Sequence, residues 1–319
     1  MLKKVLITGV SGFAGSHLAD YLVKEKEYDI CGTFLTEESL VNVKNIRDRI
    51  SVVKLDLNDE KKVFDLVKST KPDLVFHLAA LASPANSFKE PVKTITNNVA
   101  AQINLLEAIK ESNTGAKILV ISSADAYGLV SKEDLPIKEE TNFMPANPYA
   151  VSKITQDYLG LQYFLSYKLR IVRVRPFNHI GPRQSPHFVV SSFAKSIAEI
   201  EKDKINPVLN VGNLSAKRDF VDVRDMVRAY FKILIEGKEG EVYNIGRGIS
   251  YEIKDILDKL LSFSSAKIEV KKDNKLFRPN DTPDLVCDCS KLKRTINWSP
   301  EIPIEKTLKD TLDYWREIV

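Results

Sequence analysis

The most constraining feature of this sequence is a glycine-rich turn behind its first apolar segment. Residues Lys4–Thr8 read as a short strand, and glycines follow it at positions 9, 12 and 15. They let the chain turn sharply, let the backbone approach a pyrophosphate and let the next helix pack on the strand. That helix presents free N–H groups and a partial positive charge at its N-terminus. The turn therefore predicts a βα unit that binds a dinucleotide cofactor. The residues expected to contact the cofactor here are Gly9, Ser11, Gly12, Phe13, Ala14 and Gly15.

Short β-branched segments alternate with amphipathic ones throughout the first half of the chain. Such alternation is typical of a doubly wound parallel sheet with helices on both faces. The expected strands are Lys4–Thr8, Asp29–Thr33, Ser51–Leu55, Leu74–His77, Lys117–Ser122 and Arg170–Arg175. The expected helices between them are Gly12–Lys26, Glu60–Ser69, Thr94–Ser112 and Pro148–Tyr167. The predicted fold class is α/β, with a Rossmann-type doubly wound parallel sheet.

The regular alternation stops after Pro176. The helices expected beyond it are His187–Asp203, Val223–Glu236, Ile253–Leu261 and Ile304–Trp315, and the expected strands are Val242–Ile245 and Ala266–Val270. We expect a smaller C-terminal α/β lobe over the carboxyl edge of the sheet, where ligands bind in open α/β folds. The predicted division is a cofactor-binding domain at residues 1–176 and a substrate-binding lobe at 177–319, with some segments of the lobe returning to the sheet.

The charge and cysteine content exclude several classes of function. Basic and acidic residues are interleaved and leave a formal net charge of only +4, so we expect no nucleic-acid partner. Cys31, Cys287 and Cys289 have neither the spacing of a disulfide framework nor a His cluster beside them, so no metal site is predicted. No apolar run approaches the ~20 residues of a membrane span, and Met1 leads directly into a strand instead of a signal peptide. A cytoplasmic protein without a membrane partner is the expectation.

Tyr149 and Lys153 are the main candidates for proton transfer. Residues four apart share one face of a helix, so the ammonium can lie close to the phenol and to a cofactor ribose. A positive charge there is expected to lower the pKa of the phenol toward working pH. The spacing alone is expected by chance, but its position is specific: it follows Pro148, which can open a helix, and comes after the strand that ends beside Ser123. The pattern predicts an acid/base pair formed by a phenol and an ammonium.

Three segments of the sequence resemble the extended short-chain dehydrogenases/reductases. They are the TGxxGFxG loop Thr8–Gly15, Leu55-Asp56-Leu57 and His77-Leu78-Ala79-Ala80. The resemblance implies NAD or NADP as the cofactor and catalysis by Ser123, Tyr149 and Lys153. The further cofactor-binding residues that it implies are Asp56, Leu57, Leu78, Ala79, Ala80, Asn98, Tyr149 and Lys153. The end of the second strand has neither the acid typical of NAD binding nor the arginine typical of NADP binding, so the preference stays open with a slight lean to NADP.

Later segments are similar to one branch of that family, formed by the GDP-6-deoxy-D-mannose reductases and the GDP-mannose 4,6-dehydratases. They are Arg175–Gln184, Phe188–Ala194, Val211–Asp225 and Leu276–Pro279. The similarity implies a GDP-sugar substrate whose diphosphate contacts Asn178, Arg218 and Arg278. Arginine suits this role because its planar guanidinium pairs with phosphate oxygens in a bidentate way. The similarity also implies a homodimer in which Thr94–Ser112 and Pro148–Tyr167 of both copies form a four-helix bundle.

The residues after the catalytic hydroxyl distinguish two reactions of this branch. A 4,6-dehydratase needs additional acid/base groups there, typically ending in Glu, whereas this chain has Ala124, which cannot transfer a proton, and the shorter Asp125. Reduction of a 4-ketone needs only a hydride, a proton from Tyr149 and a hydrogen bond from Ser123. We therefore expect reduction of GDP-4-keto-6-deoxy-D-mannose to GDP-D-rhamnose, with Asp125 as a further catalytic candidate. A GDP-mannose 4,6-dehydratase, a UDP-sugar 4-epimerase and a protein that kept the fold without turnover are the alternatives.

Overall fold

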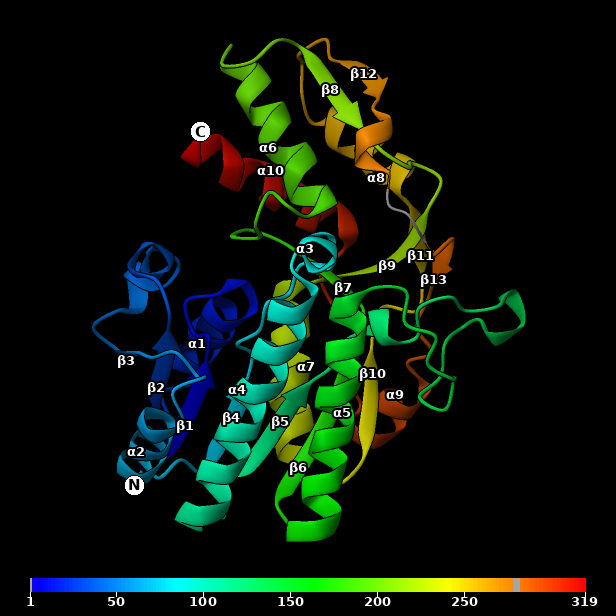
Figure 1. Ribbon diagram of the computed structural model, residues 1–319. Helices are drawn as coiled ribbons and strands as arrows, with labels where there is room; N and C mark the ends of the chain where they lie inside the picture. The colour runs from blue at the N-terminus through cyan, green and yellow to red at the C-terminus, as the bar shows by residue number, and fades with distance from the viewer. Residues whose placement is uncertain (1, 278–281) are drawn as a thin grey trace.

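A seven-stranded parallel sheet forms the core of the larger part of the molecule (Figure 1). The computed structural model describes residues 2–277 and 282–319. From one edge to the other the strands are β10 (Val242–Ile245), β6 (Arg170–Pro176), β5 (Lys117–Ile121), β4 (Leu74–His77), β1 (Lys3–Thr8), β2 (Tyr28–Phe34) and β3 (Ser51–Lys54). The strand order reverses between β1 and β4, the point at which doubly wound sheets bind their ligands. The Rossmann-type α/β fold predicted from the sequence is confirmed.

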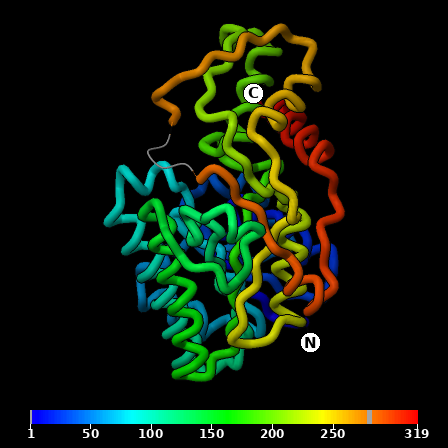
Figure 2. The backbone as a smooth tube through the Cα atoms, turned by 90° about the vertical axis from the view of Figure 1, so that its right-hand side faces the viewer, coloured from blue at the N-terminus to red at the C-terminus, as the bar shows by residue number. Residues whose placement is uncertain are grey.

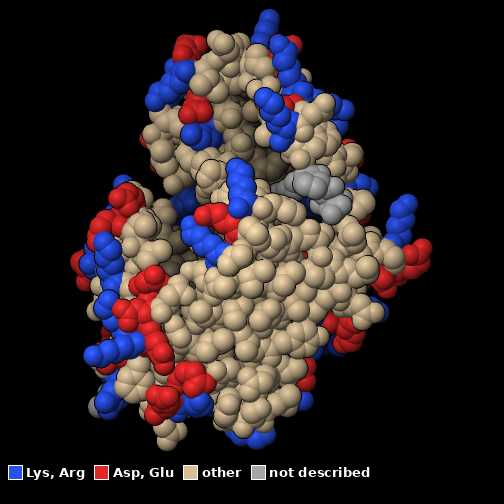
Figure 3. Space-filling model, in the orientation of Figure 1, with Lys and Arg blue, Asp and Glu red and all other residues tan. Residues whose placement is uncertain are grey.

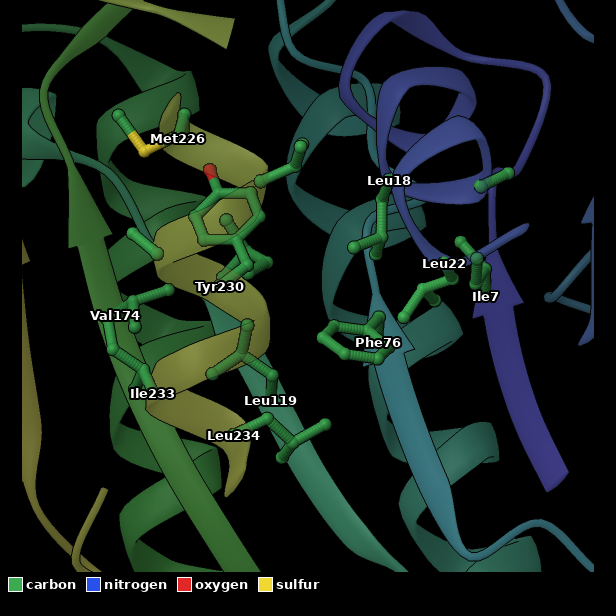
Figure 4. Packing of buried hydrophobic residues seen from close by; sticks show 14 of the residues in the cluster. Ile7, Leu18, Leu22, Phe76, Leu119, Val174, Met226, Tyr230, Ile233 and Leu234 are labelled. Carbon is green, nitrogen blue, oxygen red and sulfur yellow. The ribbon is translucent and has the colours of Figure 1, made fainter. Parts of the chain in front are cut away.

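Helices cover both faces of this sheet because alternate residues of its strands point to opposite sides. Ile7 of β1 belongs to an apolar cluster with α1 (Phe13–Glu25) and α7 (Val223–Glu236). Figure 4 shows this cluster, with Leu18 of α1 and Tyr230 of α7 among its side chains. The preceding residue, Leu6, packs on the opposite face. The helices of that face are α2 (Glu60–Thr70), α4 (Pro91–Ser112) and α5 (Pro148–Tyr167).

The chain after β6 builds a smaller part above the carboxyl edge of the sheet, called here the upper part (Figures 1 and 2). One sheet there contains β7 (Asn178–Ile180), β9 (Lys217–Asp222), β11 (Ser250–Glu252) and β13 (Asp284–Leu285), and another pairs β8 (Val208–Val211) with β12 (Glu269–Lys272). Three helices share an apolar core beside them: α6 (Val189–Glu201), α8 (Ile253–Ser262) and α10 (Ile304–Ile318). The chain crosses between the two parts more than once, since α7 and β10 lie with the seven-stranded sheet.

Several elements are not predicted by the sequence. Most of them are segments of a few residues, which carry too little periodicity to be recognised. Besides the small strands of the upper part they are α3 (Pro84–Lys89), α9 (Ser290–Ile296) and the 3-10 helices η1 (Glu37–Ile46), η2 (Ala124–Ala126), η3 (Lys132–Asp134) and η4 (Asn274–Leu276). The strand expected at Ala266–Val270 lies further along the chain, as β12. No helix among the described residues is both long and apolar enough to span a membrane.

Candidate active site

The glycine loop is folded so tightly that two of its positions exclude side chains. Gly9 has a φ of +71°, and a Cβ there would lie 3.0 Å from Cα of Ala79. A Cβ on Gly15 would lie 2.2 Å from the carbonyl oxygen of Gly9. The N-terminal end of α1, residues 12–14, lines a cavity of about 320 Å³ at the carboxyl edge of the sheet. This arrangement of bare backbone and a helix N-terminus fits the diphosphate of a dinucleotide.

Ser123 and Tyr149 meet in the wall of the same cavity. Tyr149 enters it from the first turn of α5, which Asn147 caps by accepting a hydrogen bond from the N–H of Ala150 at 2.8 Å. Ser123 follows β5 and caps η2. The hydroxyl of Ser123 lies close enough to the phenol of Tyr149 to influence its pKa. The structure thus brings together the two hydroxyls that the sequence predicts for the site.

The environment of Tyr149 keeps its phenol protonated. Burial raises the pKa of this phenol above its ordinary value, and the carboxylate of Asp125 raises it further, while the nearby hydroxyl of Ser123 acts in the opposite direction. The sequence-based expectation of a phenol pKa near working pH is wrong, because burial outweighs the charge of Lys153, whose ammonium donates to Ile121 and Gln156. A phenol that stays protonated at neutral pH is suited to donating a proton.

Lys153 lies one turn further along α5 with its ammonium turned into the protein. Its Nζ donates to the carbonyl oxygen of Ile121 and to Oε1 of Gln156, both at 2.8 Å. The Nζ atom lies 6.0 Å from the centre of the Tyr149 ring. Burial lowers the pKa of this lysine to about 7. The charge of Lys153 near neutral pH is therefore sensitive to the oxygens around it.

A second cavity, of about 620 Å³, adjoins the first and extends between α6, β8 and residues 275–277 of the upper part. A shared neck joins the two cavities; the residues that line both are Phe88, Asn178, His179, Gln184, Phe188 and Arg218. The sequence predicts only Asn178 and Arg218 of these six, because the others have no pattern specific to a chemistry. His179 also stacks on Phe13 of α1, with ring centres 5.6 Å apart. A long ligand can therefore extend from Tyr149 through the neck into the upper part.

The whole chain is similar to proteins that act on nucleotide sugars. Residues 6–311 match the family model described as GDP-mannose 4,6 dehydratase. The chain is 34% identical to a GDP-6-deoxy-D-mannose reductase of Pseudomonas aeruginosa, and the similarity covers 100% of this chain and 99% of the relative. The chain belongs to the GDP-mannose 4,6 dehydratase family.

Solved structures similar to this member of the GDP-mannose 4,6 dehydratase family include proteins with different reactions. The structure of RMD from Pseudomonas aeruginosa complexed with NADPH has a TM-score of 0.86 at 32% identity, and the match covers 99% of this chain and 100% of that one. A UDP-glucose 4-epimerase of Thermotoga maritima, solved with UDP-glucose, has a TM-score of 0.89 at 28% identity over 99% of both chains. The fold is therefore shared by reductase and epimerase, and the reaction has to be inferred from the site.

Most residues predicted for the site of this family member lie together. Those that line the first cavity are Gly12, Phe13, Ala14, Leu78, Ala80, Ser123, Asp125, Tyr149, Lys153, Asn178 and Arg218. Gly9, Gly15 and Ala79 lie behind the residues that line the cavity. Their small size lets the glycine loop and the loop after β4 approach each other. Ser11 lies on the side of the loop that faces η1, and its hydroxyl is 2.6 Å from that of Ser39.

Three predicted cofactor contacts lie elsewhere, and contact with the cofactor stays a prediction for each. Asp56 and Leu57 follow β3, with Asp56 exposed. Asn98 is fully buried, and its Oδ1 accepts a hydrogen bond from the N–H of Leu81 at 2.8 Å, so it supports the loop behind β4.

Arg278, predicted to contact the substrate, lies outside the described residues. Within residues 2–277 and 282–319, no cluster of three or more His, Cys, Asp or Glu side chains could hold a metal ion.

A buried ionic network behind the site is missed by the sequence analysis. Asp157 of α5 binds both Arg173 and Arg175 of β6. Arg175 also donates a hydrogen bond to the hydroxyl of Tyr127 at 2.9 Å, and Tyr127 ends the short segment that begins at Ser123. The network therefore ties α5, β6 and the Ser123 segment together. The one signal in the sequence is the pair of arginines within an otherwise apolar strand.

Proposed function

We propose that this protein reduces the C4 ketone of GDP-4-keto-6-deoxy-D-mannose to GDP-D-rhamnose, with NADH or NADPH as the reductant. The observation that carries the proposal is that the hydroxyls of Ser123 and Tyr149 line one cavity with the glycine loop, and that this cavity adjoins a second, larger one. Similarity along the whole chain to a reductase named for this substrate class supports the choice of sugar. The protein is thus an oxidoreductase of nucleotide sugars.

The residues of the site divide the proton chemistry among them. A bound nicotinamide supplies a hydride to C4. Tyr149 donates its proton to the C4 oxygen, and the Ser123 hydroxyl donates a hydrogen bond to the same oxygen. Carbon and oxygen then each carry one new hydrogen, which completes the reduction of the ketone. The phenolate left on Tyr149 is stabilised by the positive charge of Lys153 until it recovers a proton from solvent.

The binding roles follow from the two cavities. Gly9, Gly12 and Gly15 let the backbone and the N-terminus of α1 hold the cofactor diphosphate. Asn178 and Arg218 lie in the shared neck, where the diphosphate of a nucleotide sugar would pass. The guanidinium of Arg218 is anchored there, because it donates to the carbonyl oxygens of Lys217 and Thr282 at 2.7 Å. We infer a slight preference for NADP, which the absence of an acid at the end of β2 supports.

The main alternative reaction is dehydration of GDP-mannose, and one observation favours it. Asp125 lines the first cavity and its charge reaches Tyr149, so the site contains one carboxylate that could exchange protons. Its neighbour Ala124 has no proton to transfer. Reduction of the ketone needs no further acid or base beyond Tyr149, and it is therefore the reaction that this set of residues serves most completely.

A direct assay separates these reactions. Purified protein is incubated with NADPH or NADH and GDP-4-keto-6-deoxy-D-mannose prepared from GDP-mannose, and loss of the nicotinamide absorbance is followed together with the sugar product. Reduction predicts consumption of the cofactor and formation of GDP-D-rhamnose. Conversion of GDP-mannose alone, with no net oxidation of cofactor, would replace the reductase with the dehydratase. Interconversion of UDP-sugars without net redox change would favour an epimerase, and inactivity with all three would favour a protein without turnover.

We further propose a homodimer through α4 and α5. The face over these helices carries few charged side chains (Figure 3). On α5, Val151, Tyr158 and Leu165 are exposed and lie seven residues apart, on one side of the helix. A second copy would cover this stripe and form a four-helix bundle. Light scattering should give the mass of two chains, and Tyr158→Glu should reduce it to one. We also propose that the protein is located in the cytoplasm.

A further inference from the structure

The side chain of Gln156 bridges the ammonium of Lys153 and the backbone of α4. Gln156 lies on α5 and is fully buried. Its Oε1 accepts a hydrogen bond from Nζ of Lys153 at 2.8 Å. Its Nε2 donates to the carbonyl oxygen of Asn98 at 2.9 Å. No step of the proposed reaction uses this amide, so its contact with Lys153 calls for a separate explanation.

The backbone of α4 determines which end of the amide faces the lysine. A carbonyl oxygen can only accept hydrogen bonds, so the one of Asn98 requires the Nε2 end of Gln156. The Oε1 end is then left for Lys153. The carbonyl oxygen of Ile121 is a second acceptor for the same ammonium. Two oxygens held at 2.8 Å favour the charged form of a buried lysine over the neutral amine.

The other titratable groups nearby do not perform this role. Those around Lys153 and Tyr149 are His77 of β4, Asp125 of η2 and Tyr230 of α7. Burial lowers the pKa of His77 to about 3, so this imidazole is neutral. Burial raises the pKa of Tyr230, which therefore stays a neutral phenol. The carboxylate of Asp157, the residue after Gln156, is bound by two arginines. The amide of Gln156 is thus a side-chain acceptor in direct contact with the ammonium.

We propose that Gln156 is a positioning residue that holds the Lys153 ammonium in its charged form beneath Tyr149. The catalytic consequence rests on the proposed function, whereas the electrostatic effect concerns the folded chain alone. Burial disfavours the charged lysine, and the amide oxygen offsets part of that effect. Without this oxygen the lysine should lose its proton at a lower pH, and with a carboxylate in its place at a higher pH.

The test is an NMR titration of lysine in the full-length protein without added ligand. Lysine is labelled with ¹³C at Cε, and the Lys153 signal is assigned by its loss in Lys153→Arg. The variants are Gln156→Met, which keeps the length but removes the acceptor, and Gln156→Glu, which adds a charge. The matched control is Gln102→Met: this buried glutamine of α4 donates to the carbonyl oxygen of Gln156 at 2.7 Å and has no hydrogen bond to Lys153.

The titration midpoint of Lys153 should fall by about one pH unit in Gln156→Met and rise in Gln156→Glu, since a hydrogen bond to the charged form favours it. Gln102→Met should leave the midpoint where it is. An unchanged midpoint in Gln156→Met, or a shift no larger than that of Gln102→Met, would overturn the proposal. If circular dichroism shows that one variant is unfolded, the other decides, because the two shifts have opposite signs.

The pH profile of kcat/KM tests the catalytic consequence. Its high-pH limb should move down in Gln156→Met and up in Gln156→Glu, whereas a merely structural defect would lower activity equally at every pH. A shifted lysine titration with an unmoved profile would show that the charge of Lys153 does not limit the reaction, and would overturn the catalytic part. If the unaltered protein has no reductase activity, the proposed function fails, and the NMR titration still decides the role of Gln156.

Discussion

The carboxylate of Asp157 accepts a hydrogen bond from Nε of Arg175 at 2.7 Å in a place that solvent hardly reaches. The same carboxylate binds Arg173, so one negative charge compensates two buried cations.

Breaking such a contact leaves uncompensated charge inside the protein, which typically costs about 3–5 kcal/mol. Asp157→Asn should therefore lower the free energy of unfolding by about that amount in urea titrations. The control is Glu90→Gln, which breaks an exposed pair with Lys93 and should cost less than about 1 kcal/mol. Equal effects of the two changes would contradict the account of the network.

Tyr149→Phe removes the proposed proton donor while keeping the ring. Turnover of the 4-keto sugar should fall by about 10²- to 10⁴-fold, the usual contribution of general acid catalysis. The dissociation constant of the cofactor, measured by fluorescence titration, should change little. Unaltered turnover would remove Tyr149 from the mechanism.

Gly15→Ala tests the glycine loop as the cofactor site. The new Cβ would lie 2.2 Å from the carbonyl oxygen of Gly9, so the loop has to move. Cofactor binding should weaken by about 10-fold or more, which corresponds to about 1.4 kcal/mol. In the control Gly115→Ala the Cβ meets nothing within 4 Å, and cofactor affinity should be unaffected although the positive φ costs some stability. A variant Gly15→Ala with normal affinity would place the cofactor elsewhere.

Asp125→Asn distinguishes the proposed reduction from dehydration. The charge of Asp125 raises the pKa of Tyr149, so its removal should lower that pKa, while the high-pH limb of kcat/KM, which follows Lys153, should stay in place. At neutral pH Tyr149 would still be protonated. Reductase turnover should therefore fall by less than about 10²-fold, the smallest loss usually seen when an acid/base group is removed. A larger loss at every pH would assign Asp125 a proton transfer of its own and favour the dehydratase.

The buried Lys153 should make stability depend on pH. Burial lowers its pKa from 10.5 to about 7 in the folded protein, so between these values the unfolded chain binds more protons than the folded one. Stability contributed by this group is therefore lost as pH falls from about 10 to about 7, by at most about 1.4 kcal/mol per pH unit. Urea titrations of the unaltered protein and Lys153→Met across this window measure the difference. Parallel curves would contradict the lowered pKa.

The sequence predicts the features that repeat along the chain or depend on local backbone chemistry. The glycine turn at residues 9–15 and the alternation of strands and helices are of this kind, and both lead to the observed sheet. The contacts that complete the site join residues far apart in the chain. Gln156 meets Asn98 across two helices, and the shared neck combines Phe88 of α3 with Arg218 of β9. Nothing in the local pattern around such residues indicates their partners.

The fate of the hydride tests the proposed function most directly. NADPH carrying deuterium on either face of its nicotinamide is incubated with the protein and GDP-4-keto-6-deoxy-D-mannose, and the product is analysed by NMR. The account predicts that one of the two labelled cofactors places a single deuterium at C4 of GDP-D-rhamnose, and that the label is lost from the cofactor. A product without deuterium at C4, from either cofactor, would contradict it.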